Sequence, residues 1–336
     1  MVTDEQLRTS RAVQRRTGRT FHVATRFLPE RARYPTYVLY AFFRTADEVV
    51  DDPDPDAPAE QRAELARLRE AALGEGEPDD PVLAAFADVR ERRGVPDREV
   101  REFVDAMEAD VEPEGYDTYE DLTGYLRGSS VAVAYMMLAV MDPDDPAAAR
   151  PHARALAEAF QLTNFLRDVR EDATEYGRVY LPRATLAEHG VSAGDVRDLR
   201  ASEGVADAVR AELRRTEERY REGVAGIEHL PDDCQFPVLL SAVLYAEHHR
   251  LIRERDCDVL SATPSLGYRD YLRVVARTWW HWRRERDPEA VFYRASAIAA
   301  EDGMEPEEGT GLSGATGRRD SGCRVVDRLR SWWPVG

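Results

Sequence analysis

Apolar residues recur at helical spacing along most of this chain, and few segments show the alternation typical of a strand. The same segments are rich in the helix-favouring residues Ala, Leu, Arg and Glu. The predicted helices are Tyr34–Val50, Ala59–Leu73, Val82–Arg93, Arg98–Val111, Tyr119–Met141, Ala147–Arg170, Val205–Gly226, Pro237–Arg255 and Tyr268–Arg286. This pattern predicts one all-α domain of about ten helices over residues 5–297.

Two pairs of aspartates carry the clearest chemical signal. Asp47 and Asp51 lie in RTADEVVD at the end of the first predicted helix, and Asp168 and Asp172 lie in QLTNFLRDVRED. Residues four apart share a helix face, and like charges there disfavour the helix unless a cation compensates them. Carboxylates, waters and phosphate oxygens are the ligands that Mg²⁺ prefers. Two such pairs meeting across a cavity therefore predict a Mg²⁺ site, with Mn²⁺ as the alternative ion.

The second motif forms a stripe of polar residues. Gln161, Asn164, Asp168 and Asp172 follow the spacing of one helix face, a pattern that by itself is also typical of a solvent-exposed surface. The apolar residues between them indicate a helix that is buried on most sides. Because buried carboxylates must be paired or bind metal, two such motifs favour a functional site over a solvated face.

Charge and composition narrow the classes of protein. The chain has 64 acidic and 46 basic residues, a net charge of −18, and no lysine. A strongly acidic surface excludes non-specific binding to nucleic acid. It suits a cytoplasm of high salt, where screening reduces self-repulsion between the acidic groups. The absence of lysine fits the same interpretation, because arginine is more weakly hydrated, but codon bias explains it equally well. The hydrophobic content of 43% is sufficient for a sizeable core.

Three features lead us to expect a cytoplasmic protein. Cys234, Cys257 and Cys323 are widely spaced and form no C-x-x-C motif, as is typical of free thiols in a reducing compartment. The first five residues are acidic and lack the apolar run of a signal peptide. The most apolar run, Val131–Met141, is too short to span a bilayer.

Residues 298–336 form a tail of different composition. The stretch 301–322 is rich in Gly, Ser, Thr and Glu, which predicts disorder. It precedes CRVVDRLRSWW, a basic segment that ends in two tryptophans and is a candidate for peripheral membrane attachment. Docking on its own domain and remaining disordered are the alternatives. The sequence GTGLSG at 309–314 matches G-x-G-x-x-G but follows no predicted strand, so it does not predict a dinucleotide site.

Three segments together resemble the signatures of the squalene/phytoene synthase family. They are RTADEVVD at 44–51, QLTNFLRDVRED at 161–172 and GRVYLP at 177–182. The resemblance extends from about Phe21 to Leu260 and is closest to the phytoene synthases. It implies the all-α isoprenoid synthase (class I terpenoid synthase) fold, with one central catalytic cavity, and head-to-head condensation of two allylic prenyl diphosphates.

The resemblance also implies roles for individual residues. The positions that match metal ligands are Asp47, Asp51, Asn164, Asp168 and Asp172. The positions that match diphosphate or substrate contacts are Thr20, Phe21, Tyr40, Arg44, Gln161 and Arg178. Tyr125 and Tyr245 match active-site tyrosines, so that together with the four aspartates they form the expected catalytic set.

The implied reaction requires an apolar cavity, because a carbocation must be kept from water. The candidate lining residues are Phe21, Phe42, Phe43, Val131, Met136, Met137, Phe160 and Phe165, each of which ordinary core packing explains equally well. Two places depart from the family pattern. Arg127–Ala134 replaces an Ala-Gly-Thr-Val-Gly-like run, and Ser261–Pro264 stands where an arginine is often found.

The function implied is that of a Mg²⁺-dependent phytoene synthase. It would condense two geranylgeranyl diphosphates through a cyclopropyl diphosphate, the first committed step of carotenoid biosynthesis. Within the class, the alternative is a squalene or dehydrosqualene synthase that uses two farnesyl diphosphates, since motif spacing leaves the chain length open. A non-catalytic scaffold is the alternative from another class, and the four intact aspartates argue against it.

Overall fold

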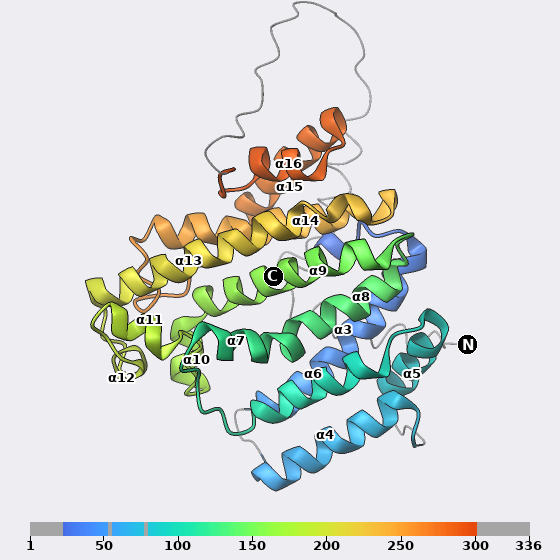
Figure 1. Ribbon diagram of the computed structural model, residues 1–336, viewed down its shortest axis with the longest axis horizontal. Coiled ribbons are helices and arrows are strands. Elements are labelled where there is room, and N and C mark those ends of the chain that lie inside the picture. The colour runs from blue at the N-terminus through green and yellow to red at the C-terminus, as the bar shows by residue number, and fades with distance from the viewer. Residues whose placement is uncertain (1–22, 53–55, 77–79, 301–336) are drawn as a thin grey trace, which may run out of the picture. The chain divides into compact units, whose positions relative to one another are not determined.

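All regular elements in the described part of the chain are helical, which confirms the all-α prediction (Figure 1). The computed structural model describes residues 23–52, 56–76 and 80–300. The elements are α3 (Glu30–Val50), α4 (Pro58–Leu73), α5 (Pro81–Arg93), α6 (Asp97–Ala109), α7 (Tyr119–Leu126), η1 (Arg127–Val131), α8 (Ala132–Met141), α9 (Pro146–Arg167), α10 (Val169–Glu175), α11 (Arg183–Glu188), α12 (Ala193–Arg197), α13 (Glu203–Val224), η2 (Ile227–His229), α14 (Asp232–Arg253), α15 (Tyr268–Glu285) and α16 (Pro288–Ala295). Of the predicted tail, residues 298–336, the part from residue 301 lies outside the described residues, and so does the GTGLSG segment within it.

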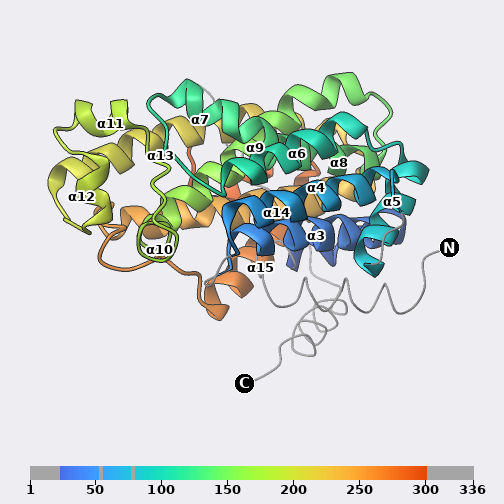
Figure 2. The same cartoon turned by 90° about the horizontal axis from the view of Figure 1, so that it is seen from below.

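Helix α9 is the central element of the helical unit. It packs against α8, α13 and α14, which run beside it in Figure 1. Helix α8 also packs against α3 and α6, and Figure 2 shows this second group from below. One core cluster fills the space among α3 to α6 and α8, and another lies among α9, α13, α14, α15 and α16. The last residue of the second cluster is Ile298, which is almost fully buried.

Local sequence explains where the helix with the second motif begins, but not where it ends. Asp145 caps α9 by accepting from two backbone amides, and Pro146 occupies its first position. The predicted continuation to Arg170 is wrong, because Asp168 leaves the helical conformation (φ −100°, ψ 12°) and α10 starts at Val169. The Asp172 amide still donates to the Asp168 carbonyl at 2.8 Å, so the two aspartates remain one turn apart.

The short helices α10, α11, α12 and α16 are not among the predicted elements. They contain only seven, six, five and eight residues. Such segments carry too few periodic positions for their hydrophobic pattern to differ from that of a loop. Their ends are nevertheless encoded locally, as in α12, where Ser192 and Asp195 form a capping box.

The predicted helix Tyr119–Met141 is interrupted by the π-helical segment η1. Gly128 allows this segment to pack on α6, since a Cβ there would lie 2.3 Å from the carbonyl oxygen of Glu102. Taken whole, the stretch is long and apolar enough to span a membrane by length and composition, unlike its shorter apolar run. However, 56% of its most apolar window is buried in the protein. In this structure it is a core helix.

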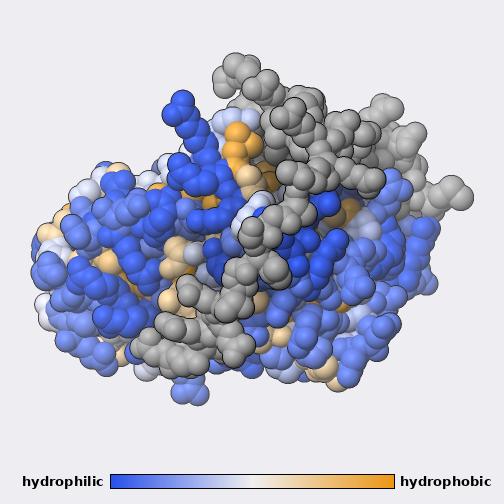
Figure 3. Space-filling model, turned by 90° about the horizontal axis from the view of Figure 1, so that it is seen from above, coloured by the Kyte–Doolittle hydropathy of each residue, from blue (hydrophilic) through white to orange (hydrophobic). Residues whose placement is uncertain are grey.

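The described surface reflects the acidic, arginine-rich composition. The face in Figure 3 is predominantly hydrophilic where its residues are described. Among the described large hydrophobic residues, only Tyr268 and Trp280 are exposed. Cys234 and Cys257 are free thiols, as predicted, and both are buried, whereas Cys323 lies outside the described residues.

Candidate active site

An elongated cavity of about 580 Å³ lies between α3 and α8 on one side and α9 and α14 on the other. This volume is typical of a site for a small organic ligand. Every described residue predicted for the site lines it: Tyr40, Arg44, Asp47, Asp51, Tyr125, Gln161, Asn164, Asp168, Asp172, Arg178 and Tyr245. Thr20 and Phe21 lie outside the described residues.

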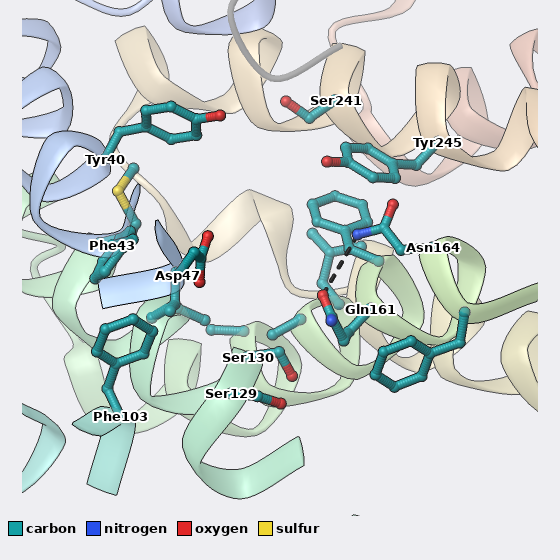
Figure 4. A pocket seen from close by; sticks show the side chains of 18 of the residues that line it. Tyr40, Phe43, Asp47, Phe103, Ser129, Ser130, Gln161, Asn164, Ser241 and Tyr245 are labelled. Carbon is teal, nitrogen blue, oxygen red and sulfur yellow. Dashed lines mark hydrogen bonds between the residues drawn. The ribbon is translucent and has the colours of Figure 1, made fainter. Parts of the chain in front are cut away.

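The first aspartate pair lies at the end of α3. Asp47 is in the last turn and points into the cavity, opposite Gln161 and Asn164 (Figure 4). Asp51 caps the same helix through its amide, which donates to the Asp47 carbonyl at 2.9 Å. The Asp47 carboxylate accepts from Arg44 at 3.2 Å.

The second pair lies at the junction of α9 and α10. Asp168 accepts from Nε of Arg167 at 2.7 Å, and among the described residues none forms an ion pair with Asp172. On the neighbouring turn of α9, Asn164 donates to the Gln161 side chain at 3.4 Å, the dashed line in Figure 4. The helix break therefore does not separate the four polar residues of the motif, since all of them line one cavity.

Arg178 connects the two aspartate motifs. Its guanidinium donates to Asp51 Oδ1 at 2.8 Å and to the carbonyl oxygens of Val50 at 3.0 Å and Asp110 at 3.2 Å. Its charge also lowers the pKa of Asp172, although burial and Asp168 act more strongly in the opposite direction. The Arg178 side chain thus holds the end of α3 against the segment that follows α10.

The electrostatics of the cavity are those of a site with too little positive charge. Burial raises the pKa of Asp47 to about 7, against the charge of Arg44. Burial, and after it the charge of Asp168, raises the pKa of Asp172 to about 8. Carboxyl groups whose pKa values are raised so far by burial and like charge are enriched at functional sites.

The donor chemistry of the two pairs fits a hard divalent cation. Carboxylate oxygens dominate, the amide of Asn164 adds a further oxygen, and neither histidine nor cysteine lines this end of the cavity. Each motif presents its own pair, and no three such groups converge on one point in the described parts of the chain. The raised pKa values show that added positive charge would stabilise the ionised carboxylates.

A buried carboxylate that the sequence motifs do not contain also faces the cavity. Asp110 follows α6 and is 6% exposed, and it accepts from the phenol of Tyr125 at 2.6 Å. Burial raises the pKa of Asp110 to about 6 despite that hydrogen bond. It lies in no aspartate pair, so only the three-dimensional structure reveals it. Arg167, Ser129 and Ser241 are further lining residues that we did not predict.

Aromatic rings form much of the wall between the polar groups. Tyr245 stacks on Phe160 with centroids 4.6 Å apart, and Phe165 stacks on Tyr180 at 3.8 Å. Tyr40, Ser241 and Tyr245 lie along one side of the cavity in Figure 4. Their faces and edges leave an apolar space beside the aspartates.

The predicted apolar lining is correct in part. Phe43, Met137, Phe160 and Phe165 line the cavity, whereas Phe42, Val131 and Met136 do not. The last three are fully buried in the core. Phe42, for example, stacks on Phe86 at 3.9 Å. Adjacent residues of one helix point in different directions, so composition alone could not separate them.

Comparisons of the sequence with known proteins all identify relatives from one family of enzymes. The family model described as squalene/phytoene synthase matches residues 14–280. The 15-cis-phytoene synthase of Synechococcus elongatus is 30% identical over 260 residues, 74% of this chain and 84% of that protein. The phytoene synthase of Cereibacter sphaeroides is 34% identical over 260 residues, 73% of this chain and 71% of that protein.

Solved structures show the same architecture. A dehydrosqualene synthase superposes with a TM-score of 0.75 at 23% identity, covering 83% of this chain and 97% of its own. The squalene synthase HpnC of Alicyclobacillus acidocaldarius gives a TM-score of 0.66 at 26% identity, covering 75% and 94%. Both likenesses extend over most of the helical unit.

Proposed function

The chain belongs to the squalene/phytoene synthase family, and from that premise we propose that it condenses two geranylgeranyl diphosphates head to head into phytoene. Its fold is the isoprenoid synthase fold predicted from the sequence. The proposal rests on one observation above all, which is the pair of aspartate motifs at one end of an otherwise largely apolar cavity. The relatives named phytoene synthase favour this product within the family.

The first chemical requirement is departure of a diphosphate group. Asp47, Asp51, Asp168 and Asp172, with Asn164, would hold divalent cations, Mg²⁺ by their donor chemistry, and a bound cation would neutralise the leaving group as a Lewis acid. Beside them, the guanidinium groups of Arg44, Arg167 and Arg178 line the cavity and can donate to phosphate oxygens.

The second requirement is protection of the allylic cation that remains. The stacked pairs Phe160–Tyr245 and Phe165–Tyr180 present π-systems to the space beside the aspartates. Aromatic faces attract a cation without reacting as water does. The apolar wall would exclude water until the double bond of the second substrate attacks the cation and a proton is lost, which gives the cyclopropyl diphosphate. Departure of the second diphosphate then gives a second cation, which must be protected in the same way until it rearranges.

The last step loses a proton, and the Tyr125–Asp110 pair is the buried polar group placed beside the apolar space. The phenol donates to the carboxylate at 2.6 Å, so Asp110 holds Tyr125 in one orientation. We propose Tyr125 as a residue that contacts the reacting chain, and Asp110 as the residue that positions it. This separation of roles agrees with the exposure of the two residues that line the cavity, since Asp110 is 6% exposed whereas Tyr125 is only half-buried.

The aspartate assignment is tested with Asp168→Asn. We expect the variant to lose turnover of geranylgeranyl diphosphate and to keep its helical circular dichroism, because asparagine preserves the shape of the side chain without its charge. Asp144→Asn, an exposed aspartate in the loop before α9, is the matched control and should turn over as the wild type does. Activity retained by Asp168→Asn would overturn the assignment.

Cellular location is a separate proposal that rests on sequence alone. We propose a cytoplasmic enzyme that associates with membranes through the basic, tryptophan-containing segment 323–333. A chain that ends at residue 300 should lose co-sedimentation with anionic phospholipid vesicles while it keeps its activity. Equal co-sedimentation of both chains would contradict this role of the segment.

A further inference from the structure

The cavity follows α9 for most of the helix. Its lining residues on that helix extend from Ala149 and His152 to Phe165 and the capping residue Asp168. The 16 residue steps from His152 to Asp168 correspond to about 24 Å at 1.5 Å per residue. The aspartates mark one end of this length, and His152 marks the other.

The far end is apolar except for His152. Its other lining residues are Met141, Ala149, Ala153, Leu156, Gly223, Gly226, Ile227, Leu230 and Val238. His152 is only half-buried, so its ring lies between the cavity and the outside of the protein. The imidazole therefore occupies the position of a cap on the end of the apolar space.

Several contacts fix the position of the ring. Nδ1 of His152 lies 2.6 Å from the carbonyl oxygen of Glu222, and the ring centroid is 5.6 Å from that of His229. Gly226 packs directly on it, since a Cβ there would lie 2.1 Å from the Cβ and Cγ of His152. Gly223 also packs closely on Leu156, where a Cβ would lie 2.7 Å from the backbone nitrogen. The end of α13 and the turn after it thus close tightly over α9.

We propose that His152 closes the distal end of the prenyl cavity and sets the longest isoprenoid chain that the enzyme accepts. The inference rests on the proposed function, because it assumes that a diphosphate lies at the aspartates. With the head group held there, the hydrocarbon extends along α9 toward His152. A chain one isoprene unit longer than the cavity must displace the imidazole, and a shorter chain leaves apolar surface unfilled.

Two substitutions change the length in opposite directions. His152→Ala removes the cap, whereas Ala153→Leu adds bulk to the same end of the cavity from the next position on α9. A methylene in an apolar pocket changes discrimination by roughly 10-fold or more, so a whole isoprene unit should change it at least as much. His152→Phe keeps the bulk without the hydrogen bond to Glu222, and His189→Ala is a histidine control at the end of α11.

The experiment measures kcat/KM for farnesyl (C15), geranylgeranyl (C20) and geranylfarnesyl (C25) diphosphates with the full chain and Mg²⁺. His152→Ala is expected to raise the C25 to C20 ratio about 10-fold, and Ala153→Leu to lower the C20 to C15 ratio about 10-fold. For His152→Phe and His189→Ala, both ratios of kcat/KM should stay within about twofold of those of the wild type.

The outcomes separate the two claims. If the wild type converts none of the three diphosphates, the proposed function fails. If the wild type makes a C40 hydrocarbon and both cavity variants keep its chain-length ratios, the role of His152 is wrong. A change with His152→Phe as large as that with His152→Ala would also overturn it, because the hydrogen bond rather than the bulk would then set the length.

Discussion

Replacing Asp172 with asparagine is expected to stabilise the cation-free protein while abolishing its turnover. Burial, and after it the charge of Asp168, raises the pKa of Asp172 from 3.8 to about 8. The folded protein therefore retains a proton at Asp172 that the unfolded chain has lost. Stability consequently falls as the pH rises from about 4 to about 8.

The size of the effect follows from this difference. Each pKa unit corresponds to about 1.36 kcal/mol. If Asp172 had no access to water, the free energy of unfolding at pH 7 would therefore be roughly 4 kcal/mol lower than at acidic pH, where the group is protonated in both states. Asp172 borders the cavity and is partly exposed, and screening reduces the expected figure to about 1 to 3 kcal/mol. Asparagine carries no charge at any pH, so the variant should recover this free energy.

The assay is thermal unfolding at pH 7 in the presence of a chelator. We expect Asp172→Asn to unfold about 2 to 5 °C above the wild type, and this difference to close toward pH 4. Adding Mg²⁺ should stabilise the wild type more than the variant, because the variant lacks one carboxylate. Asp144→Asn controls for the general effect of removing one negative charge from an acidic protein.

A lower unfolding temperature for Asp172→Asn in chelator would refute the reasoning. So would a stability gap that does not change between pH 4 and pH 8, because the gain would then not come from ionisation.

Three further predictions follow from other parts of the structure. Asp110→Asn should lower kcat about 10- to 100-fold with unchanged helical content, because Tyr125 loses its charged acceptor; wild-type kcat would remove Asp110 from the mechanism. Gly128→Ala should lower the free energy of unfolding by about 1 to 3 kcal/mol through its clash with α6, whereas Gly124→Ala, with open space around it, should gain about 0.5 to 1 kcal/mol in denaturant titrations. Equal changes in the free energy of unfolding for Gly128→Ala and Gly124→Ala would contradict the packing argument. Burial lowers the pKa of His248 to about 3. Its contribution to the free energy of unfolding is therefore present above pH 6.5 and is lost as the pH falls toward 3. His248→Gln should make the free energy of unfolding depend less on pH over this range, and an unchanged pH dependence would assign that dependence to other groups.

The sequence predicts the main helices and the site residues to different depths. Periodicity places α3, α9 and α14 well, because each buries a wide apolar face over many turns. The motifs also identify the four aspartates that line the cavity, since two half-buried pairs of like charge require counter-charge. The break of α9 at Asp168 escapes prediction, because neither proline nor glycine marks it.

Residues without a motif depend on the tertiary structure. Asp110 becomes a cavity residue only when α6 packs beside η1, and the sequence around it is that of an ordinary helix end. Phe42 and Phe43 are neighbouring residues of the same type, yet Phe42 lies in the core and Phe43 lines the cavity. His152 is similar, because its position as a cap depends on Gly226, which is distant in sequence.

The most direct test of the central claim is the mass of the hydrocarbon formed by the purified protein from geranylgeranyl diphosphate and Mg²⁺, without NADPH and at high salt. The account predicts phytoene, a C40 hydrocarbon with three conjugated double bonds at its centre. A C30 product that forms only from farnesyl diphosphate with NADPH would make the protein a squalene synthase, and no hydrocarbon from either substrate would contradict its assignment as an enzyme.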